Sequence, residues 1–104
     1  MPRLRIVGGD GVEQLVELQM PRVRIGRGRD NDIVLPDAEK GVSRVHAELR
    51  LENGRHVIVD LQSQNGTWVN GRRVDRAEVP VGAEIAVGGY RLTLLDSRGV
   101  APIA

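Results

Sequence analysis

Residues 47–60 read AELRLENGRHVIVD and contain the clearest structural signal in the chain. Apolar residues stand at every second position on both sides of its centre: Ala47, Leu49 and Leu51 before it, Val57 and Val59 after it. Asn53-Gly54 at the centre is the strongest short-range signal for a tight hairpin turn. The stretch therefore predicts two antiparallel strands that each bury one face.

Similar short alternating runs recur along the whole sequence. The other expected strands cover residues 4–6, 12–18, 22–25, 33–35, 67–69, 73–74, 85–87 and 90–94. Turn residues separate these runs, including a second Asn-Gly pair at Asn70-Gly71, and no segment has helical periodicity over ten residues. Many short strands with frequent turns predict an all-β antiparallel sandwich or barrel. Trp68 lies inside one of these runs and is expected to pack rather than to contact a ligand.

Length and composition indicate one soluble domain. The chain has 104 residues, of which 40% are hydrophobic and 28% charged, as in ordinary globular proteins. We expect the domain to span residues 1–96, and residues 97–104, which lose the pattern, to form a tail or the start of a linker. No apolar run is long enough to insert in a membrane and none resembles a signal peptide, so a cytoplasmic location is expected.

The charge balance argues against a nucleic-acid partner. The chain has 15 basic and 14 acidic residues, whereas binding to a polyanion requires many phosphate contacts. Arg22, Arg24, Arg27 and Arg29 are the residues on which the nucleic-acid alternative depends. Arg22 and Arg24 alternate with apolar residues, so a solvated strand face explains them.

Enzyme chemistry also lacks a recognisable basis in the sequence. There is no cysteine, and the two histidines, His46 and His56, have no recognisable catalytic partner. We therefore expect no catalytic residue, no metal site and no cofactor.

Three loops contain residue types suited to binding an oxyanion. They cover residues 26–32, 36–44 and 62–66. Arg27 supplies a cation at a strand end and Ser43 supplies a hydroxyl donor. Asn65 has an amide that both donates and accepts, which suits a peptide backbone. Each of these residues taken alone is also an ordinary loop or turn residue.

The order of these motifs resembles the forkhead-associated (FHA) domain family. Four blocks carry the resemblance: Gly26-Arg27, residues 31–35 (NDIVL), residues 43–47 (SRVHA) and residues 60–71 (DLQSQNGTWVNG). Together they span roughly residues 22–95. The resemblance implies a sandwich of two antiparallel sheets, with loops at one end that bind a phosphothreonine peptide.

The resemblance also implies a role for each matched residue. Arg27, Ser43 and Arg44 are expected to bind phosphate. Asn65 is expected to bind the peptide main chain, with Gln64 beside it. Gly26, His46 and Gly66 are expected to support the loops. The implied partners are a phosphothreonine-containing protein and an upstream Ser/Thr kinase, and the domain is compatible with being one part of a longer multidomain protein.

The sequence departs from the family pattern at two places. Gln64 stands where many members have Thr, and the 36–42 loop is longer than the common pattern. In that loop Glu39 would repel an anionic ligand and Lys40 would attract one. A second hypothesis therefore stays open, in which the same fold serves as a phosphate-independent scaffold or oligomerisation domain.

Overall fold

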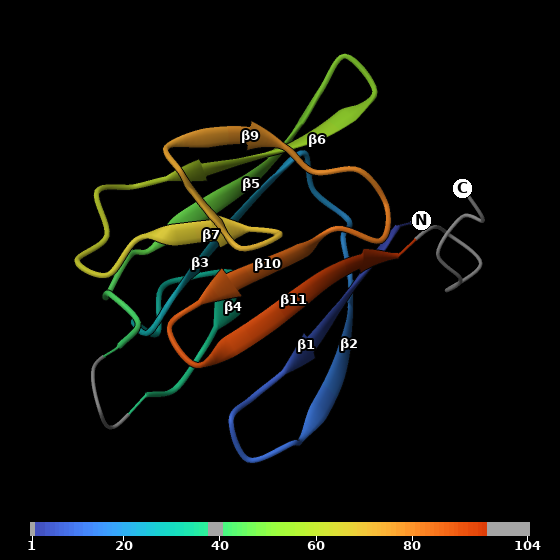
Figure 1. The fold of residues 1–104 in the computed structure, drawn as a ribbon. Helices are drawn as coiled ribbons and strands as arrows, with labels where there is room; N and C mark the ends of the chain where they lie inside the picture. Colours follow the sequence, from blue (N-terminus) through green and yellow to red (C-terminus); the bar gives the residue numbers. More distant parts are fainter. Residues whose placement is uncertain (1, 38–40, 96–104) are drawn as a thin grey trace.

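A computed structural model describes residues 2–37 and 41–95 as eleven strands. The strands are β1 (Arg3–Val7), β2 (Glu13–Glu17), β3 (Arg22–Gly26), β4 (Ile33–Val34), β5 (Ala47–Glu52), β6 (Arg55–Asp60), β7 (Thr67–Val69), β8 (Arg72–Val74), β9 (Arg76–Glu78), β10 (Glu84–Val87) and β11 (Tyr90–Leu95). They form a six-stranded sheet, β2-β1-β11-β10-β7-β8, stacked on a five-stranded sheet, β4-β3-β5-β6-β9 (Figure 1). The predicted all-β sandwich is confirmed. Glu39, Lys40 and the expected tail 97–104 lie outside the described residues.

The β5–β6 hairpin forms where the Asn-Gly signal predicts it. Asn53 and Gly54 have φ angles of 53° and 79°, the left-handed conformation that a two-residue hairpin turn requires. The core alternation departs from the prediction at two points. Leu51 is 46% exposed because it lies near the turn, and the fully buried residue of β6 is Ile58, which pairs with Leu49.

Aliphatic side chains from both sheets fill the core. The buried set includes Leu4, Ile6, Ile85, Val87, Leu92 and Leu94 from the first sheet and Val23, Ile25, Ala47, Leu49 and Ile58 from the second. Burial of each larger side chain contributes about 1.5–3 kcal/mol. Two stacked faces of this kind give the loops at the sheet ends a fixed base.

Three features differ from the sequence prediction. β9 was not predicted, because its three residues show no apolar alternation. The β3–β4 pair is parallel, so one pair departs from the expected antiparallel arrangement. Trp68 is 38% exposed on β7, where the buried residue is Thr67, so the indole packs less completely than expected.

The β3–β4 loop, the β6–β7 loop and the described part of the β4–β5 loop lie beside one another at one end of the sandwich, at the left in Figure 1. Main-chain hydrogen bonds hold them there: Arg27 N–H donates to the Ser43 oxygen at 3.0 Å and Leu61 N–H to the His46 oxygen at 2.9 Å. The described residues contain no helix that is long and apolar enough to cross a membrane.

Candidate functional site

Arg27 follows directly on the last residue of β3 and is fixed at two points. Its main chain is bound to Ser43, and its Nε donates to the Val42 oxygen at 3.1 Å. Within the described residues the two terminal nitrogens of the guanidinium make no hydrogen bond, and the side chain is half-buried. A planar, partly fixed guanidinium with two unused nitrogens is suited to an oxyanion.

Gly26, just before Arg27, lies where only glycine fits. A β-carbon at this position would lie 2.3 Å from the main-chain oxygen of Arg44. The same oxygen accepts hydrogen bonds from Gly28 N–H at 3.0 Å and from Asn31 Nδ2 at 2.8 Å. The backbones of the first two loops are therefore in direct contact, while the Arg44 side chain is exposed.

Ser43 joins the second loop to the third. Its Oγ accepts a hydrogen bond from Gln64 N–H at 2.9 Å. Because the serine hydroxyl acts as the acceptor there, its own hydrogen remains available to a ligand. Gln64 contributes its backbone to this contact, and its side chain is exposed.

His46 lies behind both loops and is fully buried. Its Nδ1 accepts a hydrogen bond from Ser43 N–H at 3.1 Å, which places the ring hydrogen on Nε2. Nε2 then donates to the Gly66 oxygen at 2.8 Å. One imidazole ring thus connects the loop of Ser43 to the loop of Asn65.

The third loop is held from inside by Asp60. Its carboxylate accepts hydrogen bonds from the hydroxyls of Ser63 and Thr67 and from Ser63 N–H at 3.2 Å. Ser63 Oγ in turn accepts Gly66 N–H at 3.0 Å. Burial alone would raise the pKa of Asp60, but the hydrogen bonds from Ser63 and Thr67 outweigh it and hold this pKa below its ordinary value.

Asn65 stands at the exposed tip of this loop. Its Nδ2 donates to the Gly41 oxygen at 3.1 Å, so the side chain lies across the second loop. The Trp68 indole Nε1 donates to the main-chain oxygen of Asn65 at 3.3 Å. Gly66 follows with a φ of 89°, which is in the left-handed region that glycine adopts readily.

The contacts gather the predicted residues at one end of the sandwich. Arg27, Ser43, Gln64 and Asn65 are connected through adjacent loops, with His46 underneath and Arg44 at the surface. Sequence reasoning did not single out Asp60, Ser63 or Asn31, which organise these loops. The three-residue spacing from Asp60 to Ser63 is the signal that was missed, because Asp commonly caps a turn in this way.

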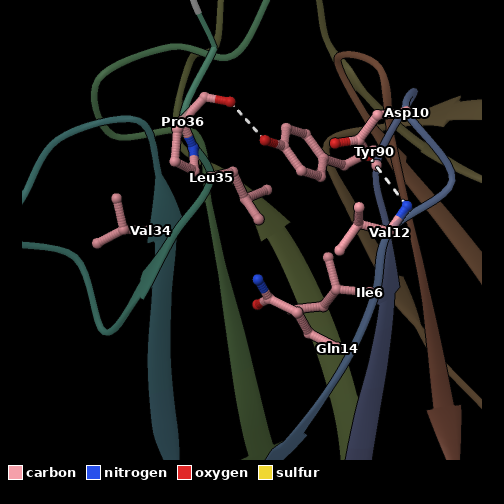
Figure 2. Close-up of a pocket in the computed structure, with 9 residues that line it drawn as sticks. Ile6, Asp10, Val12, Gln14, Val34, Leu35, Pro36 and Tyr90 are labelled. Atoms are coloured by element: carbon pink, nitrogen blue, oxygen red, sulfur yellow. Dashed lines mark hydrogen bonds between the residues drawn. The ribbon is translucent and has the colours of Figure 1, made fainter.

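A separate groove of about 370 Å³ lies between the β1–β2 hairpin and β4. Figure 2 shows Tyr90 across this groove from Val34, with its hydroxyl donating to the Pro36 oxygen. Burial and the nearby Asp37 and Asp10 carboxylates raise the pKa of Tyr90. None of the predicted site residues lines this groove. The hydrogen bond from Tyr90 to Pro36 fixes the start of the 36–42 loop at its edge.

Comparisons with known proteins identify the family of the chain. The family model described as the FHA domain matches residues 23–88. The chain is similar to the glycogen accumulation regulator GarA of Mycolicibacterium smegmatis, with 46% identity over 78 residues, which is 75% of this chain and 48% of GarA. The chain therefore spans about half the length of this curated relative.

Two solved structures are similar over nearly their whole length. One is the FhaA FHA domain complexed with the intracellular domain of Rv3910, with a TM-score of 0.79, 33% identity, and coverage of 90% of this chain and 99% of that chain. The other comes from work on phosphothreonine-dependent FHA domain interactions, with a TM-score of 0.78, 31% identity, and coverage of 97% and 99%. These likenesses confirm the resemblance drawn from the four motif blocks.

Proposed function

The chain belongs to the FHA domain family, and from this premise we propose that it binds phosphothreonine-containing peptides through the loop end of the sandwich. One observation carries the proposal. Arg27 Nε is bound to a neighbouring loop, and in the described part of the chain its two terminal nitrogens are left for a ligand. Ser43 Oγ accepts a hydrogen bond from a neighbouring loop, and its hydroxyl hydrogen is left for a ligand. A related FHA domain takes part in phosphothreonine-dependent interactions, which supports the same ligand class here.

The ligand contact that we propose for each residue follows from the chemistry of its side chain. Arg27 supplies charge to the phosphate and Ser43 a hydroxyl donor, with the exposed Arg44 at the rim. Asn65 holds the peptide main chain, and Gln64 lies beside it. A phosphate carries about −1.5 to −2 charges at neutral pH, so a cation is needed in the site. A few charge-assisted bonds of about 1.5–3 kcal/mol each, less the cost of ordering the peptide, give a dissociation constant near the micromolar range.

The supporting residues set the geometry rather than touch the ligand. We propose that His46 braces the Ser43 and Gly66 loops, and that Gly26 permits their close approach. We propose that the loop end is a binding surface and performs no catalytic step.

The proposal extends to the cellular partners. The ligand is a protein phosphorylated by a Ser/Thr kinase, and we place the encounter in the cytoplasm, where such kinases obtain ATP. The FhaA FHA domain is complexed with an intracellular domain, which supports a protein partner of this kind. GarA is a regulator about twice the length of the matched region, which is consistent with this domain being one part of a longer protein.

Calorimetric titration with three peptides of otherwise identical sequence tests the proposal. The peptides contain threonine, phosphothreonine or phosphoserine at the central position. We expect micromolar binding of phosphothreonine and no measurable binding of threonine. The methyl group is worth about 0.8 kcal/mol when buried, so phosphoserine is expected to bind about four-fold more weakly.

The alternative of a phosphate-independent scaffold predicts another result. A partner captured equally before and after phosphatase treatment would contradict our proposal and favour that scaffold. Equal affinity for phosphothreonine and phosphoserine would contradict only the methyl preference, and would leave phosphate recognition in place.

A further inference from the structure

Beside Asn65, the outer face of the β7–β8 hairpin carries a cation that the proposed function does not use. The strand register places Arg73 directly opposite Trp68. Both side chains therefore project from the outer face, since Thr67, the neighbour of Trp68, is fully buried. Trp68 holds the Asn65 oxygen, so this face is continuous with the proposed peptide site.

The guanidinium of Arg73 covers the next residue of the same loop. A β-carbon added to Gly66 would lie 2.6 Å from Arg73 Nε and 3.0 Å from its Cζ. Arg73 thus reaches from β8 to the residue that follows Asn65. The cation is held at the edge of the loop that is proposed to bind the peptide main chain.

Arg73 has no counter-charge among residues 2–37 and 41–95. Five other arginines there form ion pairs: Arg5, Arg50, Arg55, Arg76 and Arg91. Arg73 is exposed and forms neither an ion pair nor a side-chain hydrogen bond within that part of the chain. A cation of this kind next to an extended ligand favours a carboxylate or a second phosphate on the ligand.

We infer that Arg73 and Trp68 form a subsite that selects an acidic side chain within about three residues of the phosphothreonine. Arg73 lies beside Gly66, the residue after Asn65, and three residues of extended peptide span only about 10 Å. The inference rests on the proposed function and deepens it. The selected ligand class is an acidic or doubly phosphorylated phosphothreonine peptide.

Arg72 provides a matched control for Arg73. It is the neighbouring residue, is also exposed, and loses the same charge when replaced by glutamine. Its register partner is Val69, so it projects from the opposite face of β8 and lines a different cavity, with Val74 and Ala77. Long-range attraction would respond to both substitutions, whereas a local subsite responds only to Arg73→Gln.

The test is a set of phosphothreonine peptides in which one flanking position at a time, within three residues on either side, is alanine, glutamate or lysine. Binding is measured by fluorescence anisotropy with wild type, Arg73→Gln and Arg72→Gln. We expect glutamate at one position to improve binding by wild type about two- to five-fold over alanine, as exposed ion pairs do. Arg73→Gln removes that gain and Arg72→Gln keeps it, while Arg73→Glu makes lysine the favoured residue at the same position.

Each other outcome has a distinct meaning. Phosphopeptide binding by wild type without any acidic preference would overturn this inference and leave the proposed function standing. An equal loss with Arg73→Gln for every peptide would place Arg73 at the phosphate itself and would also overturn the inference. Failure of wild type to bind any of the phosphopeptides would overturn both.

Discussion

Replacing His46 tests whether one buried ring holds the two ligand loops together. His46→Ala removes the partners of the partly buried Ser43 N–H and of the buried Gly66 oxygen, and leaves a cavity behind them. Each unsatisfied group costs about 1–3 kcal/mol. With the cavity included, we expect the free energy of unfolding to fall by about 3–5 kcal/mol.

Two further variants separate the two hydrogen bonds. In His46→Asn the amide oxygen takes the place of Nδ1 and still accepts from Ser43, but the contact with Gly66 is lost. In His46→Gln the amide nitrogen takes the place of Nε2 and still donates to Gly66, but the contact with Ser43 is lost. We expect each variant to be destabilised by about half as much as the alanine variant, because each loses one of two buried bonds.

Urea unfolding followed by Trp68 fluorescence measures these differences, with His56→Ala as the control. His56 is the other histidine and is only half-buried, so its replacement is expected to cost less than about 1 kcal/mol. The proposed role of His46 in holding the loops together would fail if His46→Ala were no more destabilising than His56→Ala. It would also fail if the asparagine and glutamine variants were both as unstable as the alanine variant.

Further predictions concern the backbone, the acidic network and the ligand. Gly26→Ala drives a β-carbon into the Arg44 oxygen and should cost about 1–3 kcal/mol in urea unfolding, whereas Gly89→Ala meets nothing within 4 Å and should change stability by less than about 0.5 kcal/mol. The folded-state pKa of Asp60 is lowered, so its contribution to stability is present above its unfolded value of about 3.9 and is lost as pH falls through the lower folded value. Thermal unfolding of Asp60→Asn should therefore be less sensitive to acid than that of wild type, and an equally steep acid loss would contradict the assignment. Phosphopeptide affinity should weaken as pH falls below about 6, where the phosphate gains its second proton, and a flat titration would mean that the dianion is not recognised.

The sequence predicts the fold well where local signals are strong. Asn53-Gly54 has the turn conformation that its residue types favour, and the alternating residues of β11 face the core as expected. The miss at Leu51 has a simple cause. Alternation continues to the end of a strand, whereas burial stops where the opposing sheet stops, and that limit depends on the tertiary structure.

The alternation of apolar and polar residues does not predict the shortest strands. β9 pairs with β6 through three residues that carry no apolar signal, so its position depends on the strands around it. Trp68 alternates with the core residues of β7 and falls on the outer face. Its indole was expected to pack because it lies within a strand run, and the period of two places it opposite the buried Thr67.

The candidate site was predictable in its residue types and not in its connections. Arg27, Ser43 and Asn65 were singled out from chemistry and motif order. The bridge through His46 depends on its contact with Gly66, which lies 20 residues away in the sequence. The contact between His46 and Gly66 has no characteristic spacing in the sequence, because the two loops that it connects become neighbours only in the folded sandwich. The contacts of Asp60 are local, and the three-residue spacing to Ser63 was a signal that the sequence offered.

Calorimetric titration of wild type and Arg27→Ala with one phosphothreonine peptide shows whether Arg27 and its neighbouring loops recognise phosphothreonine. We expect micromolar binding by wild type. Arg27→Ala should lose about 2 kcal/mol or more of binding free energy, at least about thirty-fold in affinity, because the phosphate then loses its matching charge. The urea midpoints of the two proteins should stay close, since the half-buried Arg27 side chain makes a single described hydrogen bond. Equal affinity of the two folded proteins for the phosphopeptide would mean that Arg27 does not bind the phosphate.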